Sequence, residues 1–337
     1  MSDQIILPLV NHRVIIENPG KGAILKNVEE PVFAPQKGEI LISVEFCGVA
    51  MGDILYREGI SPGKFPMTPG YDVVGIVVST GPYTTAFKKG DRVVGLALTG
   101  GYTSYISLPV KNLVLVPSSV KPEDAVAAAL NYTTAYQLLV KVAKLKAGDQ
   151  ILIHGAGGGV GIATLQLCKY MGIKAYGTVS DKKMYVVEQE GAIPINYQKS
   201  DFVDFIKQRK GKIDAVFDPI GGSHLFRSFK VVRLGGTLVS FGVGAAIGGE
   251  GSALWRLIKA IIPFLLLKLN FQKKRVILYT TTAKTAGLHS SLQRIIRMLV
   301  EKEISPPIAK IFALKDAEEA QKYLLKERPS GKVLLKP

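Results

Sequence analysis

Hydrophobic and polar residues alternate over residues 13–110 in a way that is typical of β-strands. Short runs rich in β-branched residues are separated by Gly, Pro, Asn and Lys, which are frequent in turns. The runs are RVIIEN, EILISVEF, VVGIVVST, DRVVGLAL and YTSYISLPV. This pattern predicts a closed or partly closed β-barrel.

The pattern changes near Pro122. PEDAVAAALNYTTAYQLLVKVAKL has helical spacing, and a proline followed by acidic residues suits a first helical turn. The strand-like runs QILIHG, KAYGTVS, IDAVFDPI and TLVSFG then each precede a longer run, among them the predicted helix HLFRSFKVVRLGG at 224–236. RVILYTTT predicts a further strand of this sheet. Repeated strand–helix units predict a parallel sheet covered by helices on both faces.

The last part of the chain predicts two amphipathic helices, near 288–302 and 316–326, and a short final strand, GKVLLKP. The full length of 337 residues corresponds to about two domains. Two cysteines, Cys47 and Cys168, are too few for a disulfide framework or a four-thiolate zinc lobe. We expect Cys47 to be a small buried apolar group.

The chain carries 43 Lys and Arg against 27 Asp and Glu, a formal net charge of +16. That excess favours anionic partners such as nucleotides or a lipid surface. No zinc-finger spacing, RNP-like string or basic heptad region occurs in the sequence, so we expect no nucleic-acid partner. The N-terminus, MSDQIILPLVNHR, is a poor signal peptide, and we expect a cytoplasmic protein.

The segment QILIHGAGGGVGIATLQLCKYMG combines an apolar strand, a Gly-rich turn and a helix. Ala156, Gly158 and Gly161 occupy the three spaced positions of a G-x-G-x-x-G fingerprint, with Ala at the first. Small residues at these positions allow a tight turn, backbone N–H groups facing a pyrophosphate, and close helix–sheet packing. The turn and helix start, which also include Gly157, Gly159 and Val160, therefore predict a dinucleotide site.

The end of the second strand of this unit bears on the choice of cofactor. NAD-binding chains commonly place an acid there, at the position that Val179 occupies here. Ser180 follows, and then Asp181, Lys182 and Lys183. A hydroxyl and cations suit a 2′-phosphate and so favour NADPH. The alternative is that Lys182 and Lys183 bind no phosphate and are simply the first residues of a solvent-exposed helix.

A series of segments along nearly the whole chain resembles the medium-chain dehydrogenase/reductase superfamily, and within it the zinc-free quinone oxidoreductases related to zeta-crystallin. The segments include CGVAMGDILYREG, FPMTPGYDVVGIV, GGYTSYISLP, NYTTAYQLL, HGAGGGVG and IDAVFDPIGG. The resemblance implies a GroES-like β-barrel catalytic domain from residues 1–121 and 286–337, and a doubly wound Rossmann NADPH-binding domain from 122–285. It also implies a homodimer.

The resemblance also implies which residues would ligate zinc in the zinc-dependent relatives. Those positions are occupied here by Ala50, Tyr71 and Leu130. None of the three ligates zinc well, and the four histidines, at 12, 154, 224 and 289, show no metal spacing. We therefore predict no metal site and interpret His154 as structural.

The resemblance further assigns residues around the cofactor. Thr134 matches a residue that bonds the nicotinamide side of the cofactor, while Lys183 and Tyr197 match contacts to the adenosine phosphate. Ser180 joins these two as a candidate because of its hydroxyl. The residues expected near the adenine, the ribose groups and the nicotinamide are Ile220, Gly221, Phe241, Gly242 and Val243. Each of these could instead serve loop geometry alone.

The chain departs from the quinone reductase pattern near the expected catalytic centre. Ala50 replaces the usual Asn, and Leu55 stands where a Tyr is common. Tyr56, one position further, is the candidate catalytic proton donor. Backbone N–H groups and water are the alternatives, and we favour solvent as the final source of the proton.

Residues 252–275, SALWRLIKAIIPFLLLKLNFQKKR, form an unusually apolar stretch interrupted by Arg256, Lys259 and Lys268, with Pro263 near its centre. The uninterrupted apolar stretches within it are too short for a typical membrane-spanning helix. Three interpretations stay open: a wall of the substrate pocket or a dimer contact, a buried helix, or a helix in a lipid interface with its cations outward.

Taken together, the sequence predicts an NADPH-dependent, zinc-independent oxidoreductase that transfers a hydride to a small hydrophobic quinone or α,β-unsaturated carbonyl compound. One alternative is an enoyl-thioester reductase. Another is a nucleotide-binding, membrane-associated protein with little catalytic activity, because fold alone does not establish chemistry.

Overall fold

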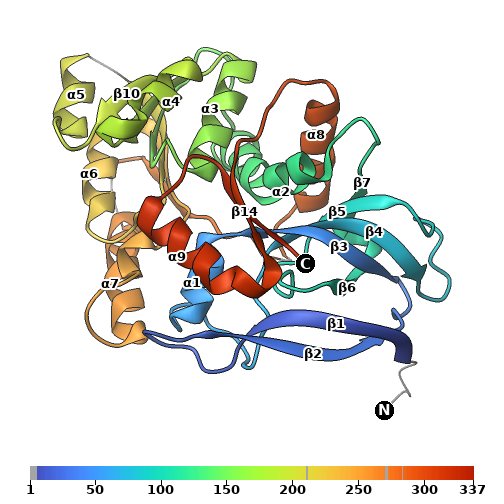
Figure 1. The fold of residues 1–337 in the computed structure, drawn as a ribbon. Helices are drawn as coiled ribbons and strands as arrows, with labels where there is room; N and C mark the ends of the chain where they lie inside the picture. Colours follow the sequence, from blue (N-terminus) through green and yellow to red (C-terminus); the bar gives the residue numbers. More distant parts are fainter. Residues whose placement is uncertain (1–5, 210–211, 270–271, 283) are drawn as a thin grey trace. The chain divides into compact units, whose positions relative to one another are not determined.

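The computed structural model describes residues 6–209, 212–269, 272–282 and 284–337 (Figure 1). Contacts divide the chain into a first unit, Met1–Thr133 with Ala286–Pro337, and a second unit, Thr134–Thr285. The sequence-based boundary at 121/122 differs, because the division falls inside α2 (Pro122–Tyr136). The first half of α2 packs Ala125, Val126 and Ala129 into a core cluster of the first unit.

The first unit contains a seven-stranded sheet in the order β14-β15-β3-β4-β5-β7, with β6 also pairing β3, and a separate β1-β2 pair. The strands of this unit are β1 (Ile6–Ile16), β2 (Leu25–Phe33), β3 (Glu39–Val49), β4 (Asp72–Thr80), β5 (Arg92–Leu96), β6 (Tyr105–Pro109), β7 (Leu113–Leu115), β14 (Ile308–Ala313) and β15 (Lys332–Lys336). Its helices are α1 (Met51–Arg57), α8 (Leu288–Val300) and α9 (Ala317–Glu327). The two helices and the final strand expected in the tail are confirmed.

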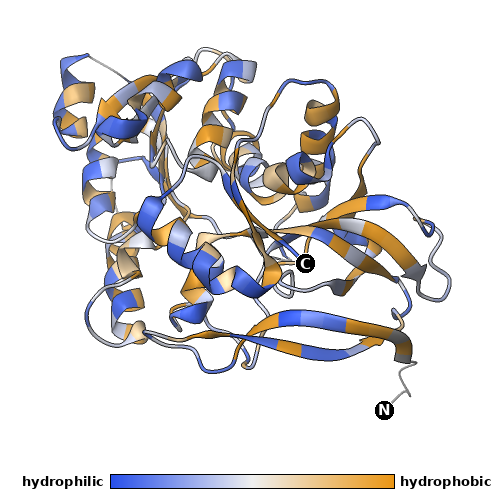
Figure 2. Cartoon of the chain, in the orientation of Figure 1, coloured by the Kyte–Doolittle hydropathy of each residue, from blue (hydrophilic) through white to orange (hydrophobic). Residues whose placement is uncertain are grey.

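Two hydrophobic clusters make up the core of this unit. One packs Ile40, Ile42 and Cys47 of β3 with Ala317 and Ala320 of α9, so Cys47 is a buried apolar group as expected. The other packs strands β3, β4 and β5 against α2 and α8. Figure 2 shows hydrophobic residues along much of β3 and β4, which fits strands covered on both faces.

The last strand is tied into this sheet by a buried ion pair. Leu334 of β15 pairs with Gly48 of β3, and Lys332 Nζ lies 2.9 Å from Asp72 Oδ2, with both side chains almost fully buried. A Cβ atom at Gly48 would lie 2.2 Å from Lys332 Cε. Glycine at this position therefore leaves room for the lysine stem.

The second unit is built on a six-stranded sheet in the order β10-β9-β8-β11-β12-β13, with every pair parallel. The strands are β8 (Gln150–His154), β9 (Lys174–Val179), β10 (Ile193–Asn196), β11 (Ile213–Asp218), β12 (Val232–Ser240) and β13 (Arg275–Leu278). The helices are α3 (Gly159–Met171), α4 (Met184–Gln189), α5 (Phe202–Gln208), α6 (His224–Val231) and α7 (Ala253–Lys268), and a π-helical segment, Gln137–Val142, follows α2. The predicted parallel sheet of an α/β Rossmann-like fold is confirmed.

The helix expected over 224–236 is wrong in its second half. α6 ends at Val231, and Val232 already has extended dihedral angles, with φ −68° and ψ 130°. Val232 is the first residue of β12 and pairs with Ile213 of β11. The β-branched pair at 231–232 favours an extended chain over a further helical turn.

Candidate functional site

The Gly-rich turn lies between β8 and α3, at the carboxyl end of the central strand of the second unit. Ala156 N donates to Thr178 O of β9 at 3.0 Å, and Gly158 N donates to Gly155 O at 3.0 Å. Gly158 is the N-cap of α3, with φ −97° and ψ 177°. The first N–H groups of the 13-residue helix have no partner within the helix, and the helix dipole places positive charge there.

Close approaches explain the small residues in this turn. A Cβ atom at Gly161 would lie 2.4 Å from Gly155 O, so the helix could not start so near the strand with any other residue. A Cβ atom at Gly177 of β9 would lie 2.5 Å from the Cβ of Ala156. The alanine at the first fingerprint position is therefore accommodated by a glycine on the neighbouring strand. The cradle retains the shape that a pyrophosphate needs.

The residues expected around a 2′-phosphate gather at the ends of β9 and β10. Val179 pairs with Asn196, so Ser180 and Tyr197 follow neighbouring strand ends, and Tyr197 N donates to Val179 O at 3.2 Å. Lys183 Nζ donates to Gly157 O at 3.4 Å, which brings its ammonium over the Gly-rich turn. The structure therefore brings these three residues together beside the phosphate cradle.

Asp181, the acid nearest to the usual ribose-binding position, is engaged elsewhere. Its Oδ1 accepts from Asn196 Nδ2 at 2.6 Å and from Lys199 Nζ at 2.8 Å. These contacts hold the carboxylate toward β10 and partly neutralise it. Among the described residues at this strand end, the cations thus dominate, which suits a phosphate better than a ribose hydroxyl.

The loops after β11 and β12 contain the remaining predicted cofactor residues and are bonded to each other. Asp218 Oδ1 accepts from the N–H groups of Ile220 and Gly221, at 2.8 and 3.0 Å. Phe241 N donates to Asp218 O at 3.0 Å. A Cβ atom at Gly242 would lie 2.6 Å from Pro219 O. Gly221 has φ +74°, so these glycines are needed for the close contact of the two loops.

Val243 lies in the loop after β12, and Thr134 is the first residue of the second unit. Val243 Cα would lie 3.5 Å from a Cβ atom at Gly221, so it borders the same turn. Thr134 is 7% exposed, and its hydroxyl lies 3.4 Å from the hydroxyl of Thr281. The structure gives Thr134 a polar neighbour that the sequence did not indicate.

A buried polar network behind these loops fixes Asp218. Asp218 Oδ2 accepts from Ser228 Oγ at 2.7 Å and lies 2.8 Å from His224 Nδ1. His154 at the end of β8 lies 3.1 Å from Ser228 Oγ through Nε2 and 3.0 Å from Thr178 Oγ1 through Nδ1. The structural interpretation of His154 fits these contacts, since both of its ring nitrogens are engaged.

The environment of this network lowers two pKa values. Burial lowers the pKa of His154 to about 3, so the ring is neutral. Burial alone would raise the pKa of Asp218, but the hydrogen bonds from His224 and Ser228 lower it to about 2. Asp218 is thus a carboxylate held ready to accept from the Ile220 and Gly221 N–H groups.

Ligand atoms of His154, Asp218 and His224 all lie within 4.8 Å of one another. The spacing of the histidines in the sequence did not indicate this cluster, because the three residues come from different elements. Each has a hydrogen-bond or ion-pair partner within the network, with Ser228 bridging His154 and Asp218. These bonds explain why the three residues lie together: they form a structural network that holds the loop after β11.

In the first unit, the three positions that correspond to zinc ligands have no zinc-binding donor set. Ala50 and Leu130 offer only backbone atoms in this region: Ala50 N donates to Asp53 Oδ2 and Leu130 N donates to Asp72 Oδ2. Burial, followed by the nearby Asp53 and Tyr56, raises the pKa of the Tyr71 hydroxyl well above its ordinary value. A phenol that stays protonated is a poor zinc ligand.

Asp53, on α1, organises the same region. Its Oδ1 accepts from Gly70 N at 2.8 Å, and its Oδ2 accepts from Ala50 N at 2.8 Å and Tyr102 hydroxyl at 3.0 Å. Burial raises its pKa to about 6 despite these bonds. Sequence reasoning used Asp53 only as part of a motif and did not predict this role.

Tyr56, the candidate proton donor, is half-buried on α1. Its ring centroid lies 6.4 Å from that of Tyr71, and a hydrogen bond with Tyr56 contributes to the raised pKa of Tyr71. A Cβ atom at Gly52 would lie 2.5 Å from the Tyr71 hydroxyl. The two phenols therefore form a pair beside α1, and sequence reasoning identified only one of them as a proton donor.

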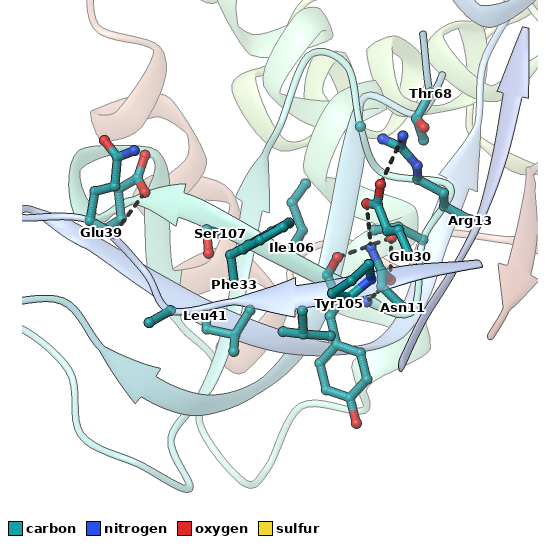
Figure 3. A pocket seen from close by; sticks show the side chains of 16 residues that line it. Asn11, Arg13, Glu30, Phe33, Glu39, Leu41, Thr68, Tyr105, Ile106 and Ser107 are labelled. Carbon is teal, nitrogen blue, oxygen red and sulfur yellow. Dashed lines mark hydrogen bonds and ion pairs between the residues drawn. The ribbon is translucent and has the colours of Figure 1, made fainter. Parts of the chain in front are cut away.

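A separate cavity of about 270 Å³ lies in the first unit beside β1 and β2. Its polar side chains largely pair with one another (Figure 3): Arg13 lies 2.9 Å from Glu30, and Asn11 Nδ2 donates to Glu30 Oε1 at 3.2 Å. Its lining contains none of the residues predicted for the catalytic or cofactor site. We therefore assign it no part in the chemistry.

Two segments of the chain match models of known protein families. Residues 36–118 match a family model described as alcohol dehydrogenase GroES-like domain, and residues 191–335 match one described as zinc-binding dehydrogenase. The second match contains none of positions 50, 71 and 130, so its description carries no information about their zinc-binding ability.

Two curated proteins and one solved structure are similar over most of the chain. The synaptic vesicle membrane protein VAT-1 homolog of Mus musculus is 30% identical over 90% of this chain and 78% of its own length. Quinone oxidoreductase of Sus scrofa is 30% identical over 89% of this chain and 90% of its own. Escherichia coli quinone oxidoreductase complexed with NADPH has a TM-score of 0.83 at 28% identity, covering 97% and 100% of the two chains.

Proposed function

Because this chain belongs to the quinone oxidoreductase-like members of the medium-chain dehydrogenase/reductase superfamily, we propose that it is an NADPH-dependent, zinc-independent enzyme that reduces a quinone or an α,β-unsaturated carbonyl compound. The family supports an oxidoreductase that uses a nicotinamide cofactor. The preference for NADPH, the acceptor and the absence of zinc are our proposal.

The position of Lys183 carries the NADPH preference. Its ammonium lies at the Gly-rich turn, within 3.4 Å of Gly157 O, and Ser180 and Tyr197 adjoin it at the ends of paired strands. A phosphate monoester presents acceptor oxygens that a cation and two hydroxyls satisfy. NADH has only a neutral ribose hydroxyl at this place, which gains no charge-assisted bond from the lysine.

The other predicted residues would contact different parts of the dinucleotide. The N–H groups of Gly157, Gly159, Val160 and Gly161 would bind the pyrophosphate, since that of Gly158 donates to Gly155 O. Ile220 and Gly221 would flank the adenine and its ribose. Phe241, Gly242, Val243 and Thr134 would border the nicotinamide end, where the bound cofactor supplies the hydride. The glycine cradle at Gly161 and the close packing at Gly242 are the observations on which this fit depends.

Zinc independence follows from the donor set at the corresponding positions. Ala50 and Leu130 have no ligating side chain, and the Tyr71 phenol is held protonated by burial. The negative charge that develops on a carbonyl oxygen must then be stabilised by hydrogen-bond donors. Backbone N–H groups, water and the Tyr56 hydroxyl are the candidates, and we favour solvent as the final proton source.

The test compares binding of NADPH and NADH to Lys183→Ala. A charge-assisted hydrogen bond contributes roughly 1.5–3 kcal/mol, so NADPH affinity should fall about ten- to a hundredfold while NADH affinity hardly changes. Lys182→Ala is the matched control, because this neighbouring lysine is exposed. Equal losses for both cofactors would assign Lys183 a purely structural part.

Activity is tested by NADPH oxidation across phenanthrenequinone, other quinones, enones, alkenals and enoyl thioesters. Turnover of quinones or enones supports the proposal, and turnover of enoyl thioesters alone supports an enoyl-thioester reductase instead. Tight NADPH binding without turnover of any acceptor supports a nucleotide-binding protein of low activity. The similarity to VAT-1 homologues, which are named as vesicle membrane proteins, is the reason to test for a nucleotide-binding protein of low activity.

A further inference from the structure

Helix α7 presents an apolar face that nothing in the described part of the second unit covers. Six side chains on and just after it are between 45% and 73% exposed: Leu254, Trp255, Ile262, Leu265, Leu266 and Leu269. Asn270 and Phe271, also in the apolar segment 252–275, lie outside the described residues. The size and contiguity of this face distinguish it from single exposed apolar residues, which are ordinary on protein surfaces.

The exposed residues form one continuous stripe. Leu254, Ile262, Leu265 and Leu269, with the half-buried Ile258 between the first two, follow one another at intervals of three or four residues. At about 100° per residue this spacing keeps them on one side. Trp255 and Leu266 widen the stripe to about a third of the helix circumference. No polar residue interrupts it.

The opposite side of α7 is fixed to the protein. Phe264 and Leu267 pack in the core cluster of the parallel sheet, and Ala260 O accepts from Gly222 N at 3.0 Å. Arg256 is 5% exposed and donates to Ala246 O at 3.0 Å. The expectation that the cations of this segment face outward is therefore wrong for Arg256, whose guanidinium is buried and bonded to the backbone.

Two lysines border the apolar stripe on its two sides. At about 100° per residue, Lys259 lies just beyond Leu266 on one edge and Lys268 just beyond Leu254 on the other. Both are exposed, and Lys259 Nζ lies over the Trp255 ring, 5.2 Å from its centroid. The segment 252–275 contains no Asp or Glu, and the exposed Lys273 and Arg275 follow the helix.

We propose that α7 is a docking helix for the surface of an anionic lipid bilayer. Its apolar stripe would enter the boundary between headgroups and acyl chains, while Lys259 and Lys268 extend to the lipid phosphates on either side. Among the described residues no helix is both long and apolar enough to cross a bilayer, and an in-plane helix does not need to be.

Charge favours this partner over a second copy of the chain. A two-fold contact of α7 with α7 places the same surface on both sides, so the bordering lysines of one copy would meet those of the other. Like charges facing each other oppose such an interface. Anionic headgroups neutralise the same lysines. The helix is already packed on the sheet, so little ordering cost accompanies docking.

The chain offers its own probe, because Trp255 is its one tryptophan and lies in the stripe. The intact protein is mixed with phosphatidylcholine vesicles, with or without phosphatidylserine, at low and high salt. We expect a blue shift of the Trp255 emission, and quenching by brominated lipid, only with phosphatidylserine and low salt. Unchanged emission with anionic vesicles at low salt would overturn the proposal.

Two double variants test the contributions of the apolar stripe and of its bordering lysines to vesicle binding separately. Leu265→Ser with Leu266→Ser, and separately Lys259→Glu with Lys268→Glu, should each reduce vesicle flotation at least tenfold. Leu267 is left intact because it faces the core. Leu234→Ser, at another exposed leucine of the second unit, is the matched control and should float like the wild type.

Two further outcomes would contradict the proposal. Flotation that survives both double variants would place lipid binding elsewhere on the chain. A blue shift that appears without vesicles as protein concentration rises, together with a doubled mass in light scattering, would identify a second copy as the occupant of the stripe.

Discussion

Acid should destabilise the second unit through His154. Burial lowers the pKa of this imidazole from 6.5 to about 3, while the unfolded chain regains the ordinary value. Between these two values the unfolded state binds a proton that the folded state does not. Stability contributed by the neutral ring is therefore complete above pH 6.5 and is lost as the pH falls toward 3.

The magnitude follows from one proton per molecule. Each pH unit below the unfolded pKa reduces the free energy of unfolding by about 1.4 kcal/mol, so lowering the pH to about 5 removes about 2 kcal/mol. Asp218, whose pKa is lowered to about 2, adds a loss in the same direction only in stronger acid. Asp53, whose pKa is raised to about 6, titrates over part of the same range in the opposite sense, so the histidine is isolated only by comparing the wild type with a His154 variant.

Urea unfolding monitored by the fluorescence of Trp255, in the second unit, gives the stability at each pH. His154→Gln removes the titrating ring, so below pH ~6 its stability should fall with a slope about 1.4 kcal/mol per pH unit shallower than that of the wild type. His12→Gln, at an exposed histidine of the first unit, controls for the loss of an imidazole. Equal slopes for the wild type and His154→Gln would refute a neutral, buried His154.

Two other predictions concern the cofactor turn and the proton donor. Gly177→Ala should lower the free energy of unfolding by about 1–3 kcal/mol, because its Cβ would meet the Cβ of Ala156; adding Ala156→Gly should restore most of the loss in thermal unfolding, and no restoration would locate the strain elsewhere. Tyr56→Phe should reduce phenanthrenequinone at nearly the wild-type rate if solvent supplies the proton, whereas a loss of roughly a hundredfold in kcat would identify Tyr56 as the acid.

Most strands and helices were predictable because each carries its own pattern. β8, β9, β11 and β12 contain apolar runs, and Gly155 and Pro219 directly follow β8 and β11. α8 and α9 have clear amphipathic spacing. β2 was not predicted, because LKNVEEPVF places charged residues along a strand that pairs only with β1. β7 has three residues, too few to show an alternation.

The parts of the site that were missed depend on contacts across the sheet. His154, Asp218 and His224 meet only because β8 and β11 are neighbours. Gly177 accommodates Ala156 only through the packing of the turn on β9. Likewise, the sequence of α7 shows apolar residues around most of the helix, and only its packing on the sheet reveals that Leu267 faces inward and Leu265 outward.

The position of β15 has a consequence for the order in which the chain can fold during synthesis. β15 lies inside the seven-stranded sheet, between β14 and β3, and brings the Lys332 partner of the buried Asp72 carboxylate. The first unit therefore lacks an inner strand until residues 332–336 have left the ribosome. The second unit is one continuous stretch that ends about fifty residues earlier, so it can fold first. Until β15 is synthesised, the first unit has an unpaired edge on β3, and the Asp72 carboxylate lacks its lysine partner.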